Sequence, residues 1–552
     1  MDRSFPGGAL NSLSHVPALL VFAAGILPGH CSPDHATNRP NILFIAVDDL
    51  RPELGCYGKD DIKSPNIDAL ARNGMVFDRA YCQEATCSPS RTAVMTGVRP
   101  DTSKVWDLRT SFRDALPDVL TLGQQFKANG YFVQGMGKIY HVGMTGDGRS
   151  LDDPATWSVP WQNPKAPLYA SGQGTDRRKD GVTASAEPDG TKGEGASIGS
   201  YSQPDPHASP KKTGMQGKRG QSRGPVYECA DVPDNTYTDG KVADLAVKTL
   251  REIGKKEPFF LAVGFIRPHL PWVAPKKYWD LYDPANIGLA TNQFLPLDAP
   301  FAVDPNDGEI RSYGGCPRRG PVPEDLQRKF KQAYFASLSY SDAQIGRVLD
   351  ELRRQGLEKN TIVILWGDHG WKLGEHMAWG KHSNVENDVN APLILSVPGM
   401  KHAGSHSRAL VEFVDIYPTL CELAGIPLPG HLEGTSFKPL LDDPGRPWKA
   451  AAFSQWPRGR GETGIGDLMG YTMRTDRYRF TIWVDRNDNS HVASIELYDH
   501  QRDPQENVNI AGKPENSEIV KQLMEQCRSG WRSSKPPLPS SPSARSGNRG
   551  SS

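Results

Sequence analysis

The sequence predicts an α/β protein with a large, mostly parallel sheet flanked by helices and a small antiparallel sheet near its C-terminus. Three continuous apolar runs have the length of buried parallel strands, and charged residues follow each of them: 41–47, 258–266 and 361–366. From about residue 448 the pattern changes to short alternating segments, which predict the antiparallel sheet. The 55 glycines and 46 prolines favour a loop-rich α/β enzyme over a helical bundle.

The 552 residues are enough for one large domain and a smaller one. Because 64 basic residues balance 64 acidic ones, the net charge does not indicate a nucleic-acid partner or an anionic membrane. We expect a catalytic domain over 37–445, a C-terminal subdomain over 446–530 and a disordered tail over 531–552. A stretch at about 170–224, rich in Gly, Ser, Lys, Asp and Pro, is predicted to be a low-complexity surface insertion.

A short apolar run at 16–27 fits the central part of a signal peptide and is too short for a comfortable membrane span. We therefore interpret residues 1–36 as a signal peptide and linker. The protein is expected to be exported to a periplasmic, secreted or lysosome-like compartment. No other run could span a bilayer, so the mature protein is expected to have no integral membrane segment.

Two acidic residues, Asp48 and Asp49, directly follow the first predicted strand, 41–47. Ligands of open α/β sheets bind beyond the carboxyl ends of the strands, so two adjacent carboxylates there indicate a hard cation. A capping role would need only one of them. A helix over 64–74, with a proline at its first position, then leads into a short strand.

The stretch from Cys87 to Pro100 reads Cys-Ser-Pro-Ser-Arg-Thr-Ala-Val-Met-Thr-Gly-Val-Arg-Pro. Ser88 suits an N-cap, Pro89 suits the first helical position and Gly97 suits the end of the helix. This interpretation places residue 87 just before a helix N-terminus, where free N–H groups and the helix dipole favour a sulfate or phosphate. A capped helix that happens to follow a buried cysteine fits the same residues.

The next candidates are cations and imidazoles in two loops that follow strands. A helix over about 120–129 precedes a short strand, which is followed by Lys138 and His141. Such a pair can clamp a sulfuryl group and move a proton, although a single lysine or histidine is more often an ordinary surface residue. The strand at 258–266 leads into a proline-rich loop that places His269 at the same edge of the sheet.

Two predicted helices, 238–253 and 323–354, keep apolar residues at helical spacing. The strand at 361–366 follows the second helix and ends beside Asp368 and His369. Because the carboxyl ends of parallel strands meet at one edge, these side chains are expected near the first two carboxylates. An oxygen-rich set suits Ca²⁺ or Mg²⁺ better than Zn²⁺. The predicted cation ligands are Asp48, Asp49, Asp368 and His369.

The remaining elements complete both parts of the chain. Lys381 follows on a loop, and a strand at 391–397 and a helix at 415–424 belong to the large domain. A last helix is predicted near 516–527. The short alternating strands of the C-terminal subdomain are predicted at 451–456, 470–473, 478–484 and 494–498.

Several separate stretches match one family in identity and in order. They are Val-Asp-Asp-Leu-Arg-Pro (47–52), Cys-Ser-Pro-Ser-Arg (87–91), Gly-Lys-Ile-Tyr-His (137–141), Arg-Pro-His (267–269), Asp-His-Gly-Trp (368–371), Leu-Gly-Glu-His (373–376) and Met-Gly-Tyr-Thr-Met-Arg-Thr (469–475). With these motifs the chain resembles the type I sulfatases, within the alkaline-phosphatase-like superfamily, and more closely their iduronate-2-sulfatase branch. The match runs from Asn38 to about Asn509.

This resemblance implies a particular nucleophile and a particular ion. Cys87 would be oxidised after translation to formylglycine by a formylglycine-generating maturation enzyme, and the hydrated aldehyde would be the nucleophile. One Ca²⁺ per chain is expected in preference to Mg²⁺. Its implied ligands are Asp48, Asp49, Asp368 and His369, with residue 87 completing the set.

The resemblance also implies a role for each remaining candidate. Arg91 and Lys138 would stabilise the hydrate, and His141 would be the base that helps to regenerate the aldehyde. His269 and Lys381 would face the sulfate ester, with His269 acting as the acid for the departing alcohol.

The implied function is hydrolysis of sulfate esters in a sulfated oligosaccharide or polysaccharide, most specifically the 2-O-sulfate of a uronic acid. Arg51 and Trp371, beside the metal ligands, are hypothetical contacts for the sugar carboxylate and ring. Two alternatives fit the same motifs: a phosphodiesterase or phosphonate monoester hydrolase of the same superfamily, and a sulfatase fold that only binds sulfated glycans. Because all expected catalytic positions are occupied, an enzyme is favoured over a binding protein.

Overall fold

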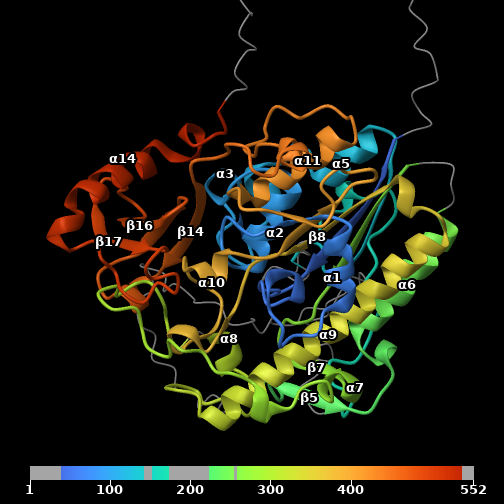
Figure 1. Cartoon of the computed structure of the whole chain (residues 1–552), viewed down its shortest axis with the longest axis horizontal. Coiled ribbons are helices and arrows are strands. Elements are labelled where there is room, and N and C mark those ends of the chain that lie inside the picture. Colours follow the sequence, from blue (N-terminus) through green and yellow to red (C-terminus); the bar gives the residue numbers. More distant parts are fainter. Residues whose placement is uncertain (1–38, 142–151, 173–222, 254–257, 307, 538–552) are drawn as a thin grey trace, which may run out of the picture. The chain divides into compact units, whose positions relative to one another are not determined.

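A computed structural model describes residues 39–141, 152–172, 223–253, 258–306 and 308–537 (Figure 1). The run interpreted as a signal peptide, nearly all of the predicted insertion and residues 538–552 of the predicted tail lie outside the described residues. Among the helices of the described part, none combines the length and the apolar character needed to span a bilayer.

A seven-stranded mixed sheet lies at the centre of the large domain (Figure 1). Its strand order is β12 (Ser405–Ser407), β2 (Met75–Phe77), β11 (Leu393–Ser396), β8 (Thr361–Gly367), β1 (Asn41–Val47), β6 (Phe259–Phe265) and β4 (Phe132–Gly137). In this sheet β11 runs antiparallel to its two neighbours, and all other pairs are parallel. The predicted large, mostly parallel sheet is confirmed.

The central parallel strands end level with one another. Val47 at the end of β1 lies opposite Phe265 of β6 and Gly367 of β8, and Gly137 of β4 lies opposite Gly264. Beyond Gly137 the backbones of β4 and β6 remain in contact, because the next N–H after Gly137 donates to the Gly264 carbonyl at 3.0 Å. The segments that follow these strands therefore start at one edge, where ligands bind in open α/β folds.

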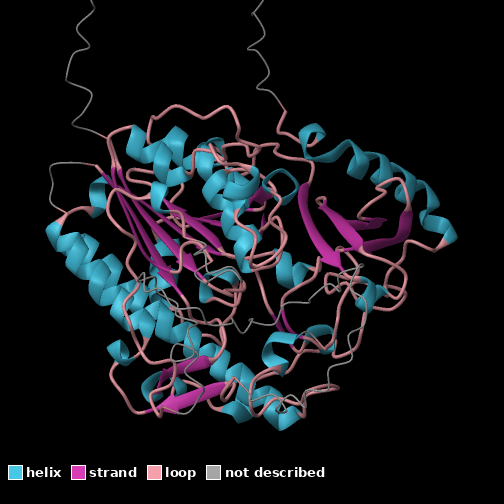
Figure 2. Cartoon of the chain, turned by 180° about the vertical axis from the view of Figure 1, so that it is seen from behind, coloured by secondary structure: helices cyan, strands magenta, loops and turns pink. Residues whose placement is uncertain are grey.

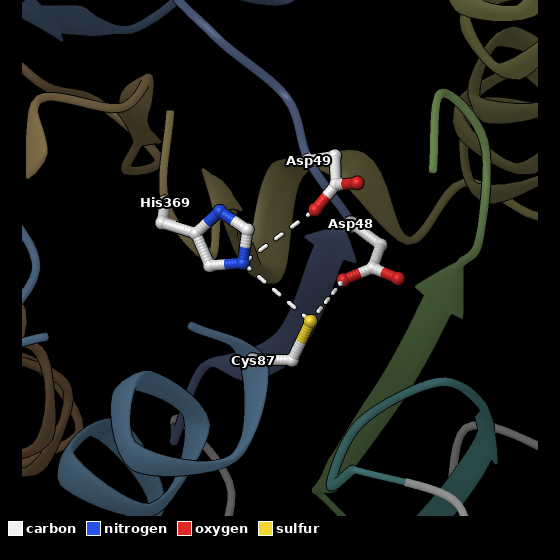
Figure 3. Close-up of side chains that lie close together, drawn as sticks. All are labelled: Asp48, Asp49, Cys87 and His369. Atoms are coloured by element: carbon white, nitrogen blue, oxygen red, sulfur yellow. Dashed lines mark hydrogen bonds and ion pairs between the residues drawn. The ribbon is translucent and has the colours of Figure 1, made fainter. Parts of the chain in front are cut away.

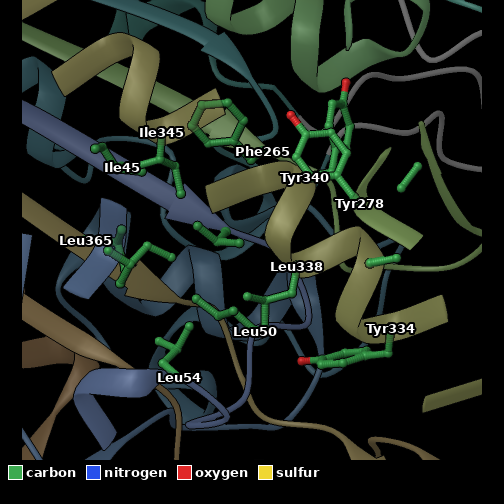
Figure 4. Close-up of a cluster of buried hydrophobic side chains, with 14 of the residues drawn as sticks. Ile45, Leu50, Leu54, Phe265, Tyr278, Tyr334, Leu338, Tyr340, Ile345 and Leu365 are labelled. Atoms are coloured by element: carbon green, nitrogen blue, oxygen red, sulfur yellow. The ribbon is translucent and has the colours of Figure 1, made fainter. Parts of the chain in front are cut away.

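Helices cover both faces of the sheet (Figure 2). Alternate residues of β1 point to opposite sides, so Ile45 lies in one apolar core and Phe44 in another. The first core, part of which Figure 4 shows, contains side chains of α1 (Pro65–Arg72), α6 (Thr238–Glu252) and α9 (Glu324–Arg354). The second contains side chains of α2 (Cys87–Thr96), α5 (Leu122–Ala128) and α11 (Ile416–Leu423).

The predicted C-terminal antiparallel sheet is also confirmed. Its strands are β14 (Ala452–Arg458), β15 (Leu468–Arg474), β16 (Tyr478–Asp485) and β17 (Val492–Asp499), and α14 (Ser517–Ser533) covers one face. This helix continues beyond its predicted end near residue 527. Near the C-terminal end of this helix, the Trp531 ring packs against Arg99, whose guanidinium carbon lies 4.9 Å from the ring centre.

Candidate active site

The helix α2 begins at Cys87 itself, so the predicted N-cap at Ser88 is wrong. Thr86 is the N-cap in extended backbone, and its carbonyl accepts the N–H of Ser90 at 3.2 Å, which places the cysteine inside the first turn. N–H groups of a first turn have no partner within the helix, so residue 87 still lies where an anion is favoured. The helix ends at Gly97 as predicted, with a φ of 70°.

Four of the predicted side chains meet at the edge of the sheet (Figure 3). Cys87 Sγ lies 3.3 Å from Asp48 Oδ1 and 3.5 Å from His369 Nε2. The same imidazole nitrogen lies 3.5 Å from Asp49 Oδ1. One ligand atom of each residue lies within 4.8 Å of those of the other three, and all four residues are buried. This arrangement brings together four of the five expected metal ligands.

Asp368, the fifth expected ligand, lies beside this cluster, with Oδ1 3.6 Å from His369 Nε2, and it also has partners of its own. Its Oδ1 accepts the backbone N–H groups of Asp49 at 3.0 Å and His369 at 3.1 Å, and its Oδ2 lies 2.8 Å from Arg91 Nε. Arg91 also lies 3.2 Å from Asp48 Oδ1. In this structure Asp368 therefore connects the two loops of the site and neutralises Arg91.

Two lysines lie on either side of the cysteine. Lys138 Nζ pairs with Asp48 Oδ2 and lies 3.6 Å from the Cys87 sulfur. Lys381 Nζ lies 2.6 Å from Asp49 Oδ1 and 3.4 Å from the same sulfur. An atom attached to residue 87 would thus face two ammonium groups, which suits the stabilisation of an anionic sulfuryl group.

The two adjacent carboxylates differ in their electrostatics. Burial alone would raise the pKa of Asp48, but Lys138 and other cations hold this pKa well below its usual range. Burial raises the pKa of Asp49 to about 7 against the effect of Lys381. Asp49 Oδ2 is buried and accepts no hydrogen bond from any described residue. A buried oxygen without a partner, beside a second carboxylate, fits a bound hard cation.

The imidazole of His369 is held so that one nitrogen is free for such an ion. Its Nδ1 donates to the carbonyl of Gly370 at 2.9 Å, which leaves the lone pair of Nε2 directed at the cluster. Burial lowers the pKa of His369, so the ring remains neutral, as a metal ligand must be. By contrast, burial and Asp48 raise the pKa of the Cys87 thiol well above its usual range, and a protonated thiol is a poor nucleophile.

His269 and His141 occupy the surroundings of this cluster. His269 Nδ1 donates to the Leu270 carbonyl at 2.7 Å, and Nε2 lies 3.9 Å from Asp48 Oδ2. Burial lowers the pKa of His269 to about 4, against the effects of Glu309 and Asp48. His141 Nδ1 has no hydrogen-bond partner among the described residues, and burial with Lys138 lowers its pKa well below its usual range. A neutral His141 can accept a proton.

Glu309 is a residue of the site that sequence reasoning missed. It lies on the short helix α8 (Gly308–Arg311), with Oε1 3.3 Å from His269 Nε2 and Oε2 3.6 Å from Lys381 Nζ. No strand ends near it in the sequence, so no pattern marked it. A carboxylate here contacts both groups that are expected to face the substrate.

The hypothesis that Arg51 and Trp371 contact the sugar is wrong for this structure. Arg51 pairs with Glu53 and Glu375, each at 2.9 Å, and donates to the Trp371 carbonyl at 3.0 Å. The Trp371 side chain is fully buried, with the Lys381 ammonium 5.3 Å from the centre of its ring. The charge of Arg51 is therefore already paired, and the Trp371 ring is inaccessible to a sugar, although its indole Nε1 has no hydrogen-bond partner among the described residues.

Comparisons with known proteins agree with this geometry. A family model described as Sulfatase matches residues 40–426, and one described as N-sulphoglucosamine sulphohydrolase, C-terminal, matches residues 374–531. Iduronate 2-sulfatase of Mus musculus is 33% identical over 88% of this chain and 94% of its own length.

Two solved structures share the fold. A protein in complex with its substrate D-glucosamine-2-N,6-O-disulfate matches with a TM-score of 0.66 at 22% identity, over 90% of this chain and 99% of that chain. Phosphonate monoester hydrolase of Agrobacterium radiobacter matches with a TM-score of 0.66 at 23% identity, over 90% of this chain and 96% of its own.

Proposed function

Because this chain belongs to the type I sulfatase family and is a sulfuric ester hydrolase, we propose that it removes the 2-O-sulfate of a uronic acid from sulfated glycans. One observation carries the proposal: the Cys87 side chain lies in a buried cluster with two lysines within 3.6 Å and a carboxylate at 3.3 Å. Such a cluster suits a nucleophile that attacks an anionic ester.

We propose that Cys87 is converted to formylglycine. The hydrated aldehyde would supply one hydroxyl to attack sulfur and a second to expel the sulfate, which neither a thiol nor a serine offers. The raised pKa of the thiol argues against the unmodified side chain as the nucleophile, because a thiol is protonated and weakly nucleophilic at neutral pH. A formylglycine-generating maturation enzyme is the partner that this step requires.

Asp48, Asp49, His369 and residue 87 would hold one calcium ion, and Asp368 would join them. When bound, calcium would lower the pKa of a hydroxyl on residue 87 and offset negative charge. Its support here is the oxygen-rich donor set and the buried Asp49 oxygen without a hydrogen-bond donor.

The side chains around residue 87 would then share the work on the ester. Lys138 and Lys381 would offset charge on the sulfuryl oxygens, a contribution of several kcal/mol in a buried site. Arg91 would act on residue 87 through Asp48 and Asp368, which it holds in place. His269 would protonate the departing oxygen, since an anionic ester beside it would raise its pKa above the value of about 4. His141, whose Nδ1 has no hydrogen-bond partner among the described residues, would accept the proton that is released when the aldehyde forms again.

The substrate class is supported by the identity to a relative named iduronate 2-sulfatase over most of both chains. A sulfated oligosaccharide or polysaccharide would be the partner, and we propose that the protein meets it after export. A second candidate activity is phosphonate monoester or phosphodiester hydrolysis, because a phosphonate monoester hydrolase shares the fold.

Two measurements test this proposal. Mass spectrometry of the peptide that holds residue 87 should find the aldehyde in active enzyme, and an unmodified thiol there would reject the nucleophile. Defined disaccharides that differ only in the position of one sulfate should lose sulfate from O-2 of a terminal uronic acid, and cleavage at another position only would reject the substrate. Faster turnover of an aryl phosphodiester than of the matched aryl sulfate would favour the second activity.

A further inference from the structure

A pocket with a volume of about 270 Å³ lies between the segment that follows α2 and the C-terminal sheet. The segment after α2 contributes Asp101, Lys104 and Trp106 to its lining, and the part of the chain with the C-terminal sheet contributes Tyr471 and Arg486. We call it the Trp106 pocket. None of these residues has a role in the site described above. Its volume lies slightly below the range of about 300–1,000 Å³ typical of small-molecule sites, so it suits a single sugar ring.

The acidic group of the Trp106 pocket is fully occupied by donors. Asp101 Oδ1 accepts from Trp106 Nε1 at 3.2 Å and from Gln455 Nε2 at 2.9 Å, and Oδ2 accepts from the Tyr471 hydroxyl at 2.9 Å. These bonds orient the two aromatic rings and offset the carboxylate charge. A half-buried indole held in this way offers a rigid apolar surface to a ligand.

The two cations of the pocket lack such partners. Lys104 Nζ and Arg486 Cζ each lie 5.5 Å from the centre of the Trp106 ring, and both side chains are exposed. Neither cation forms an ion pair with any described residue. Each cation therefore remains available to pair with an anionic group of a ligand that packs against the Trp106 ring.

A buried acid near Asp101 belongs to the segment that precedes the nucleophile. Glu84, three residues before Cys87, is fully buried, and its two carboxyl oxygens accept no hydrogen bond from any described residue. Burial and Asp101 raise the pKa of Glu84 well above its usual range, so it adds no negative charge beside the pocket. Gln455 binds the same segment, because its N–H donates to the Gln83 carbonyl at 2.8 Å. The pocket therefore borders the loop that carries the nucleophile.

We propose that the Trp106 pocket is a second subsite, which binds a sugar ring carrying a sulfate or carboxylate in the same glycan whose ester is cleaved. This inference rests on the proposed function for the identity of the glycan. Trp106 would contact the ring, and Lys104 and Arg486 would bind its anionic group.

The test is a binding measurement in the Cys87→Ala background, so that hydrolysis plays no part. Isothermal calorimetry with a heparin-derived hexasaccharide should show about five- to tenfold weaker binding for the double variant Lys104→Gln/Arg486→Gln, as expected for two charge pairs at a partly exposed site. The matched control is Lys359→Gln/Lys521→Gln, which removes two exposed cations outside the pocket and should bind within about twofold of the parent. Lys104→Arg/Arg486→Lys should keep most of the affinity.

Equal affinity of the Lys104/Arg486 double variant and its control would overturn the subsite. A desulfated hexasaccharide that keeps its carboxylates, measured on both the parent and the Lys104/Arg486 double variant, tells which anion the pocket binds. If that anion is sulfate the two proteins should bind it equally, and if it is a carboxylate the double variant should still bind more weakly. A different result would reject the proposed function and leave the subsite intact. In that case no 2-O-sulfate would be released from a terminal uronic acid, while the hexasaccharide would still bind in a way that needs Lys104 and Arg486.

Discussion

Acidic and basic side chains gather around Cys87 and also between α10 (Glu386–Val389) and the C-terminal sheet, where Glu506 and Arg479 are buried and Glu386 is partly exposed. In the second cluster, Glu386 and Glu506 both pair with Arg479. Tyr81 donates to the other oxygen of Glu386 at 2.9 Å, and the Glu386 N–H donates to the other oxygen of Glu506 at 2.8 Å. Every carboxylate oxygen of this pair therefore has a donor.

The cluster around Cys87 differs at one oxygen. Both clusters bring at least three possible metal ligands close together, the second through Glu386, His500 and Glu506. Proximity alone therefore does not distinguish them. Asp49 Oδ2, however, is buried without a donor from any described residue. Since a buried polar group needs a partner, the carboxylates of the second cluster need no further ligand, whereas Asp49 in the first cluster still has a place for a cation. The second cluster does contain a buried atom without a partner among the described residues, Arg479 Nη1, but this atom is a hydrogen-bond donor and cannot bind a cation.

The largest expected effect is the loss of activity in Cys87→Ala. If the first cluster is the active site, sulfate release should fall by at least about 10³-fold, because a lost nucleophile cannot be replaced by its neighbours. Initial rates on a defined 2-O-sulfated substrate measure it. Cys82→Ala, which removes another buried thiol of the same segment, should remain active. Normal turnover by Cys87→Ala would show that residue 87 is not the nucleophile and that the cluster around it is not the active site.

Arg479→Met should lower stability and leave activity intact, the opposite of what is expected for Cys87→Ala. It leaves the buried Glu506 and the partly exposed Glu386 without their shared cation, so the free energy of unfolding should fall by about 3–5 kcal/mol while kcat of the folded protein is kept. Denaturant titration measures the first quantity. Arg477→Met removes a half-exposed pair with Asp499 at 2.6 Å and should cost less than about 1 kcal/mol. Equal losses in both variants would mean that the second cluster is not a structural network.

Calcium should distinguish the clusters directly. After chelation, adding Ca²⁺ at about 100 times its dissociation constant should stabilise the protein by about 2.7 kcal/mol. Scanning calorimetry should find this increase in Arg479→Met and should not find it in Asp49→Asn. Metal analysis of the unmodified protein should give one calcium per chain. A calcium effect that disappears in Arg479→Met and persists in Asp49→Asn would show that the ion binds in the cluster around Arg479, and would contradict a calcium site beside Cys87.

The smallest expected effect concerns Glu309→Gln. The charge of Glu309 raises the pKa of His269, and without it the protonated fraction at pH 7 should fall about tenfold for each unit that this pKa drops. The basic limb of the pH profile of kcat should therefore move to lower pH. Glu309→Asp keeps the charge and should show a smaller shift. An unchanged pH profile in Glu309→Gln would show that Glu309 does not influence the protonation of His269 during catalysis.

The parts of the site that the sequence predicted are those that follow strands directly. Asp48 and His369 could be placed together because β1 and β8 are parallel and end level, as their apolar runs indicated. Glu309 could not be found, because its approach depends on the path of a long loop segment between β7 (Trp272–Pro275) and α9. Trp371 was misjudged for a related reason: its neighbours in the sequence are site residues, but its side chain is covered by the core.

The contact between β4 and β6 gives Gly264 an importance that its chemistry does not suggest. A Cβ atom there would lie 2.1 Å from the Lys138 carbonyl oxygen, and one at Gly137 would lie 2.0 Å from the Gly264 carbonyl oxygen. Neither glycine touches a reacting group. A single added methyl would nevertheless displace the lysine that faces the nucleophile, since two backbones cannot yield as a flexible side chain can. Among inherited variants of such a protein, a change from glycine to alanine at this position would belong with the damaging ones.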